Sequence, residues 1–197
     1  MLVHNAQTAA PGDTILDHLS DIKDYLKLLL SSEHYHLMLV QGPPGWGKSS
    51  LTRRVLSELG QDYRELGSYC TPLALYNGLV EHPSELLMVD DCAGLFHNAL
   101  SMSLLNAATW PTSDNGPRMV KWTSTTELAA ANQINFKGKI IVLTNALPQT
   151  PQAEAFISRS LYYRLEIDPT AIEKHLLEAA LETERFANSK LAADVAR

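Results

Sequence analysis

The clearest chemical signal in the sequence is a glycine-rich loop that ends in a lysine and a hydroxyl. Residues 42–49 read Gly-Pro-Pro-Gly-Trp-Gly-Lys-Ser and fit G-x-x-x-x-G-K-[ST] at every fixed position. In this pattern backbone N–H groups converge on phosphates, the lysine reaches the β- and γ-phosphates, and the hydroxyl ligates Mg²⁺. The loop therefore predicts a site for ATP and Mg²⁺. Its predicted binding residues are Gly42, Pro43, Pro44, Gly45, Trp46, Gly47, Lys48, Ser49 and Ser50.

Two adjacent carboxylates follow the apolar run at residues 86–89. A Mg²⁺ ion on ATP needs an acidic group at the far side of the phosphates. We predict that Asp90 holds the metal together with Ser49, and that Asp91 polarises the attacking water. The alternative for Asp91 is a plain helix cap, since acidic N-caps are common.

An asparagine is the third candidate, because Asn145 closes the apolar run at residues 139–144. An amide at the carboxyl end of a central strand, beside the phosphate crevice, can orient the water or contact the γ-phosphate. The alternative is a turn-forming asparagine that bonds its own backbone.

These groups need strands and helices that bring them together. Short apolar runs bounded by turn residues predict buried parallel strands, whereas apolar residues spaced by three and four predict helices. The predicted strands cover residues 35–41, 63–68, 86–90, 139–144 and 161–167, and an exposed strand of a hairpin covers 118–123. The predicted helices begin at Asp13, after the glycine-rich loop, at Thr71, at Asn98 and at Asp168. This alternation predicts an α/β fold: a P-loop NTPase three-layer sandwich with a mostly parallel sheet.

Length and composition limit the remaining choices. The 197 residues suit one domain, which we divide into a flexible N-terminus (1–12), an ATPase core (13–168) and a short C-terminal helical segment (169–197). A net charge of −6 argues against coating nucleic acid through bulk charge. Cys70 and Cys92 have neither zinc nor disulfide-scaffold spacing. With no leader or membrane-length apolar run in the sequence, we expect a cytoplasmic protein without membrane contact.

In the order of its motifs the chain resembles AAA+ ATPases and the related superfamily III helicases. The resemblance rests on the loop at 42–49, then Asp90-Asp91 as the Walker B motif, then Asn145 as sensor 1, then Arg159 before another strand. It implies that Arg159 is an arginine finger that acts on the ATP of a neighbouring subunit. It also implies ATP hydrolysis at the interfaces of a homo-oligomeric ring, with a hexamer favoured. The likeness covers residues 37–167.

The chain departs from the family pattern in two places. Walker B reads Asp-Asp here, whereas many AAA+ proteins have Asp-Glu, so a shorter side chain must reach the water. Only a short segment follows Asp168, so the helical lid is shortened or absent, and Arg185 is too weak a match for a sensor 2 arginine. Arg164 is the second candidate for the finger.

Basic and aromatic residues interleave in one segment, at Arg118, Lys121 and Trp122, with Lys137 and Lys139 following. In superfamily III helicases a hairpin in this interval grips DNA, so the resemblance implies a nucleic-acid contact here. The alternative is an ordinary edge hairpin blunted by charge.

Three classes of function fit these signals. The leading hypothesis is a Mg²⁺-dependent ring ATPase that remodels or unwinds DNA in replication. A nucleoside or small-molecule kinase is the first alternative, although it needs neither the second carboxylate nor the asparagine. A helicase loader or nucleotide-dependent switch acting on a protein partner is the other.

Overall fold

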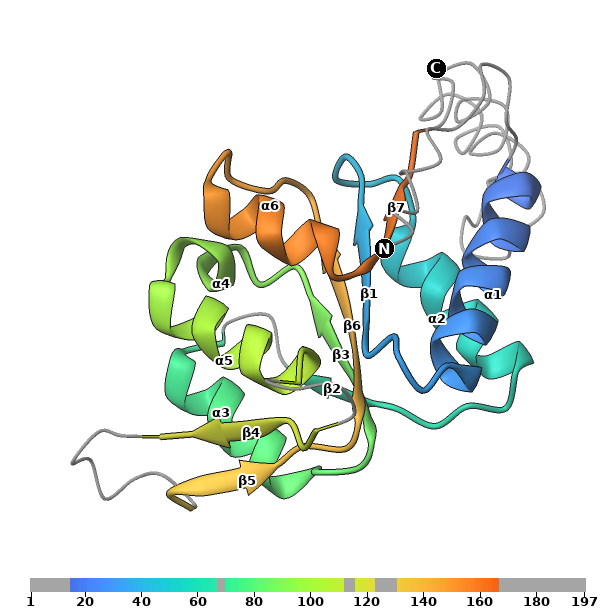
Figure 1. Ribbon diagram of the computed structural model, residues 1–197. Coiled ribbons are helices and arrows are strands. Elements are labelled where there is room, and N and C mark those ends of the chain that lie inside the picture. Colours follow the sequence, from blue (N-terminus) through green and yellow to red (C-terminus); the bar gives the residue numbers. More distant parts are fainter. Residues whose placement is uncertain (1–14, 67–69, 112–115, 123–130, 167–197) are drawn as a thin grey trace, which may run out of the picture.

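A parallel sheet lies at the centre of the computed structural model (Figure 1). The model describes residues 15–66, 70–111, 116–122 and 131–166. The strands of this sheet are β1 (Leu37–Gln41), β2 (Arg64–Leu66), β3 (Leu86–Asp90), β6 (Lys139–Thr144) and β7 (Leu161–Arg164). The five strands lie in the order β2-β3-β6-β1-β7, and every pairing is parallel. The predicted strands are therefore all present, with β1, β2 and β7 shorter than the sequence suggests.

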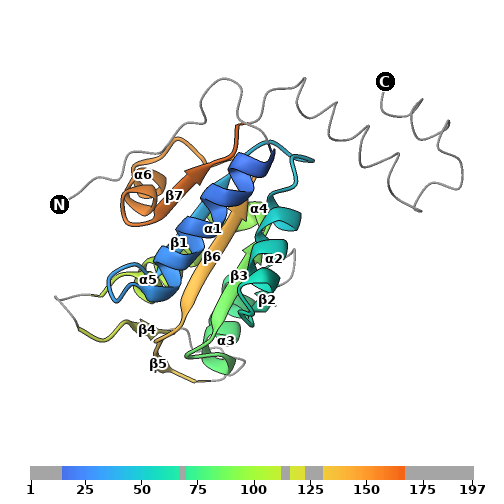
Figure 2. The ribbon, with the colours of Figure 1, turned by 90° about the vertical axis from the view of Figure 1, so that its right-hand side faces the viewer.

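Helices cover both faces of the sheet. The six described helices are α1 (Ile15–Ser31), α2 (Lys48–Glu58), α3 (Pro72–Glu81), α4 (Ala93–His97), α5 (Ala99–Thr109) and α6 (Pro151–Ser158). Figure 1 shows α1 and α2 on one side and the other four on the opposite side, and Figure 2 looks onto α1 and α2 across the strands. The predicted α/β sandwich is confirmed.

The alternation of side chains along the central strands explains the two layers. In β1, Leu37 and Leu39 pack in the cluster that contains α3, α5 and α6, whereas Met38 and Val40 pack in the cluster that contains α1 and α2. Successive residues of a strand point to opposite faces, so a continuous apolar run is buried on both. Neither face of these strands is left for solvent.

Capping residues set the helix starts. Thr71 accepts a hydrogen bond from the N–H of Ala74 at 3.1 Å, and Asn98 accepts one from Leu100 at 2.9 Å. Thr150 caps α6 in the same way, with Pro151 at the first helical position. Helix α6 was not among the predicted helices, although Thr150-Pro151 is the same signal that marks α3 at Thr71-Pro72.

A hairpin lies apart from the main sheet and is formed by β4 (Met119–Lys121) and β5 (Gln133–Asn135), which pair antiparallel. This confirms a strand within the predicted range 118–123 and supplies its partner. The strand is not exposed as predicted, because Arg118 and Val120 are buried, and residue 123 lies outside the described residues. The predicted helix starts at Asp13 and Asp168, and the whole of the segments 1–12 and 169–197, lie outside the described residues.

Candidate active site

The carboxyl ends of β1, β6 and β3 bring the predicted site residues to one edge of the sheet, which we call the phosphate edge. The register pairs Gln41 with Thr144 and Asp90 with Leu143, so the chain leaves all three strands at the same level. Two backbone hydrogen bonds extend the pairing, from Gly42 N to Thr144 O at 3.2 Å and from Asp91 N to Leu143 O at 3.1 Å. Because β6 lies between the other two strands, the residue after it, Asn145, is placed between the loop and the carboxylates.

Backbone geometry explains the glycines of the loop. Gly45 and Gly47 have φ values of 80° and 77°, which side chains disfavour. A Cβ on Gly42 would lie 2.9 Å from both the Cβ and the carbonyl oxygen of Leu165. Gly47 is the N-cap of α2 and offers no side-chain acceptor, so the first N–H groups of this helix are left for an anion.

Lys48 is held inside the site rather than extended into solvent. Its ammonium group donates to the carbonyls of Gly42 at 2.8 Å and Pro43 at 2.9 Å, and to Asn145 Oδ1 at 2.6 Å. Only 6% of the residue is exposed. Burial lowers the pKa of Lys48, while the nearby charges of Asp91 and Asp90 oppose that shift.

A second chain of contacts joins Ser49 to Asp90 and Arg53. Ser49 Oγ donates to Asp90 Oδ1 at 2.8 Å, and Arg53 donates to Asp90 Oδ2 at 2.9 Å and to Glu65 at 2.7 Å. A hydroxyl beside a carboxylate is a set of hard oxygen donors, which fits Mg²⁺. Arg53 was not among the predicted site residues, although its place one helical turn after Ser49 puts both on one face of α2.

Asn145 connects Lys48 to Asp91. Its amide nitrogen donates to Asp91 Oδ1 at 2.7 Å while its oxygen accepts from Lys48. Asp91 has φ 51°, and among the described residues it is the one non-glycine with positive φ. The N-cap of α4 is Cys92, so Asp91 does not cap that helix. The Asn145 side chain bonds Lys48 of α2 and Asp91 after β3, and not the backbone of its own turn.

These groups line a cavity of about 290 Å³ at the phosphate edge. Its walls are formed by Pro44, Gly45, Gly47, Lys48, Ser49, Ser50, Asp90, Asp91 and Asn145. Three predicted residues of the loop do not line it. Gly42 and Pro43 supply carbonyls to Lys48, and Trp46 packs against the core under α1 and α2.

Arg159 lies at the opposite edge of the sheet from this cavity. It follows α6 and precedes β7, whose first residue Leu161 pairs with Met38 near the start of β1. Its guanidinium lies over the ring of Trp110, with 5.3 Å from Cζ to the ring centroid. No carboxylate among the described residues pairs with it, whereas Arg164 is bonded to Glu166 at 2.6 Å. Within the described segments, the charge of Arg159 is therefore not neutralised by an ion pair.

The predicted nucleic-acid strip does not form one surface. Arg118 is buried, donates to Ala108 O at 2.8 Å and covers the ring of Phe136. Trp122 packs against Tyr76 with ring centroids 5.4 Å apart, and only Lys121 is exposed. The prediction that Arg118, Lys121 and Trp122 face one ligand was wrong in geometry, because successive residues of a strand point to opposite sides and Lys121 therefore faces away from the other two.

Two absences hold for the described part of the chain. No group of three or more His, Cys, Asp or Glu residues there could hold a metal ion by itself. Nor does it contain a helix of the length and apolarity needed to span a membrane.

The parallel sheet, the glycine-rich loop and the polar residues at the strand ends define an α/β fold of the AAA+ P-loop type. The crystal structure of domain III of the replication initiation protein DnaA from Thermotoga maritima is similar in fold, with a TM-score of 0.53 and 17% sequence identity. The match covers 96% of this chain and 77% of that chain. No protein-family model and no curated protein matches the sequence. The likeness supports the AAA+ type of fold, and the closer resemblance to superfamily III helicases stays a prediction.

Proposed function

We propose that this chain is a Mg²⁺-dependent ATPase that hydrolyses ATP at the interfaces of a homo-oligomeric ring. The observation that carries the proposal is the Asn145 side chain, which bridges Lys48 and Asp91. A site that only held phosphates would need the lysine and the loop. The bridge brings the Asp91 carboxylate next to the lysine and the loop, which supports a role for Asp91 in activating a water.

The residues have separate roles in the proposed reaction. The β- and γ-phosphates would replace the carbonyls of Gly42 and Pro43 as partners of Lys48, in reach of the N–H groups of α2. Ser49 and Asp90 would hold Mg²⁺, which neutralises charge on the phosphates. Asp91 would accept the proton as water attacks the γ-phosphorus and the bond to ADP breaks, with Asn145 orienting the carboxylate.

Arg53 is a positioning residue in this scheme. By bonding the second oxygen of Asp90 and also Glu65, it fixes the carboxylate between α2 and β2. The remaining oxygen of Asp90 then faces Ser49.

DNA is the proposed substrate on which the ring acts. The support is the solved structure of similar fold, which is a domain of a replication initiation protein, and the exposed Lys121 on the hairpin. A protein partner, as for a helicase loader, is the alternative that the same site would serve.

Steady-state turnover of ATP in water alone tests the proposal. We expect hydrolysis without an added acceptor, rising more than linearly with protein concentration, and light scattering should show a ring-sized species with a non-hydrolysable ATP analogue. Turnover that needs an added hydroxyl acceptor would identify a kinase instead. Binding without turnover would identify a nucleotide switch.

A further inference from the structure

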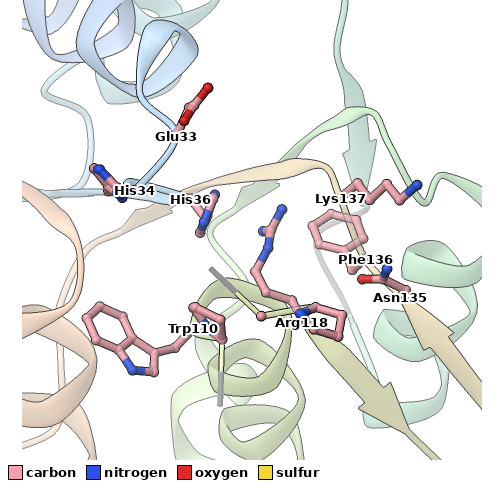
Figure 3. A pocket seen from close by; sticks show the side chains of 11 residues that line it. Glu33, His34, His36, Trp110, Arg118, Asn135, Phe136 and Lys137 are labelled. Carbon is pink, nitrogen blue, oxygen red and sulfur yellow. The ribbon is translucent and has the colours of Figure 1, made fainter. Parts of the chain in front are cut away.

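A second and larger cavity lies at the opposite edge of the sheet, and we call it the amino-end cavity. Its volume is about 900 Å³. Three parts of the chain line it. They are residues 33–36 before β1, residues 110–111 after α5 together with 116–118 before β4, and residues 135–137 before β6. Figure 3 shows the guanidinium of Arg118 projecting between His36 and Phe136, with Trp110 across the cavity.

Arg118 is a buried charge to which the described residues offer no carboxylate partner. It is 7% exposed, it bonds the carbonyl of Ala108, and its guanidinium lies 5.4 Å from the centroid of the Phe136 ring. No ion pair joins it to any acidic residue of the described segments. Buried charges in proteins are normally paired, because removing an ion from water costs several kcal/mol. The cavity thus contains a cation whose counter-charge is not supplied by the described chain.

The other ionisable groups described around the cavity leave the charge of Arg118 uncompensated. Burial, Arg118, Lys139 and His34 together lower the pKa of His36 to about 4, so this imidazole stays neutral at pH 7. The Nδ1 atom of His36 is buried and has no hydrogen-bond partner among the described residues. Lys137 also lines the cavity, with its ammonium group directed away from Arg118 (Figure 3). The single acidic lining residue of the described part is Glu33, whose side chain points away from Arg118 (Figure 3).

Trp110 gives the cavity an aromatic wall. The guanidinium of Arg159 lies over one face of its ring, 5.3 Å from the centroid, and the residue is still 46% exposed. An exposed aromatic face beside a cationic end matches a phosphate joined to a flat base, because bases stack on tryptophan. The volume also falls in the range of small-ligand sites, about 300–1,000 Å³, and is much larger than a phosphate alone needs.

We propose that the amino-end cavity binds one nucleotide unit, with its phosphate at Arg118 and its base against the face of Trp110 that Arg159 does not cover. The exposed Lys137 side chain would turn toward the phosphate on binding and supply a second cation. The unit comes either from a free nucleoside monophosphate or from a strand of single-stranded DNA. The proposal does not rest on ATP hydrolysis at the phosphate edge.

Two probes that lack a polyphosphate separate this site from the glycine-rich loop. They are dTMP and a short fluorescein-labelled oligothymidylate without a terminal phosphate, each added with and without saturating ATPγS. Calorimetry measures the first and anisotropy the second. We expect saturable binding that ATPγS does not displace. If dTMP alone binds, the source is a free nucleotide, and if the oligonucleotide binds more tightly, the source is a strand.

Variants locate the binding. Lys137→Ala should weaken it several-fold and reduce the salt dependence by about 0.7 on a log–log plot for a single strand. Lys27→Ala is the matched control, since it removes an exposed lysine from α1. Trp110→Ala should weaken binding by roughly 5- to 150-fold, whereas Trp110→Phe should keep most of it.

Arg118→Ala removes a buried packing group, so circular dichroism must first establish that it folds, and Arg118→Lys serves in its place if it does not. Three results would overturn the proposal. The first is no saturable binding of either probe. The second is binding that Lys137→Ala and Trp110→Ala leave unchanged, and the third is oligonucleotide binding that depends on Lys121 alone, which would place the ligand on the hairpin.

Discussion

The two edges of the sheet each bury a cation, and they treat it differently. Lys48 at the phosphate edge is 6% exposed and donates to three oxygens, one of which connects it to Asp91. Arg118 at the other edge is 7% exposed and has one carbonyl and one ring face. The first cation is held by three oxygens, whereas the second has one carbonyl oxygen and no side-chain acceptor among the described residues. A cation whose oxygen partners a ligand can replace suits a site where a reaction takes place. A cation without a counter-charge suits a site that only binds an anion.

The largest expected effect tests whether the two edges meet across a subunit boundary. Arg159 lies at the amino-end edge, and in a head-to-tail ring it would reach the phosphate edge of its neighbour. Arg159→Ala should lower ATP turnover by about 10³-fold or more while ATP binding survives, as for other arginine fingers. Steady-state kinetics measures the ATP turnover, and nucleotide titration measures the ATP binding.

Mixing supplies the control for this prediction. Arg159→Ala and Lys48→Ala proteins, each inactive alone, should regain partial turnover together, because some interfaces then combine an intact loop with an intact arginine. Arg164→Ala, an exposed arginine already paired with Glu166, should have little effect. If co-assembled mixtures stay inactive, Arg159 does not act in trans.

The next effect concerns the phosphate edge alone. Asp91→Asn keeps the shape of the side chain but removes the charge that would take the proton from water. We expect turnover to fall by about 10²-fold or more with ATP binding retained. Unchanged turnover would mean that another group activates the water, and single-turnover kinetics with ATP in deficit would show this directly.

The third prediction concerns two glycines, Gly138 at the amino end of the sheet and Gly42 at the phosphate edge, and how closely other atoms pack against each. An added Cβ at Gly138, before β6, would lie 2.1 Å from the backbone oxygen of Glu85, whereas at Gly42 the nearest atoms are at 2.9 Å. Gly138→Ala should therefore destabilise the fold more than Gly42→Ala, each by about 1–3 kcal/mol or more. Gly94→Ala, which meets no atom within 4 Å, is the control. Urea unfolding at constant m-value measures the order, and an equal loss at all three would contradict it.

The smallest effect belongs to His36. Its folded pKa of about 4 lies below the ordinary value of 6.5, so the unfolded chain takes up a proton first as the pH falls. Stability should therefore decrease from pH 6.5 to pH 4, by less than about 2 kcal/mol since partial exposure weakens the shift. His36→Asn should flatten this part of the stability profile, and a profile identical to that of the unchanged chain would contradict the assignment.

Much of the fold was predictable because its signals are local. The runs at 86–89 and 139–143 are apolar at nearly every position, which a strand buried on both faces tolerates best, and they form β3 and β6 as expected. α6 was missed because its eight residues carry a weak apolar pattern, and its signal was confined to Thr150-Pro151. The end of β7 was misplaced by three residues, since strand ends depend on the neighbouring strand.

By itself the sequence determined the glycine-rich loop and the residue types at the strand ends, because a phosphate cradle needs consecutive backbone N–H groups that one short segment supplies. Only the tertiary structure decided which distant groups meet. The order of the strands placed Asn145 between Lys48 and Asp91, and packing turned Arg118 inward, toward a cavity built from three separate segments. Contacts between remote segments depend on how layers pack and not on local spacing, so no pattern in the chain announces them.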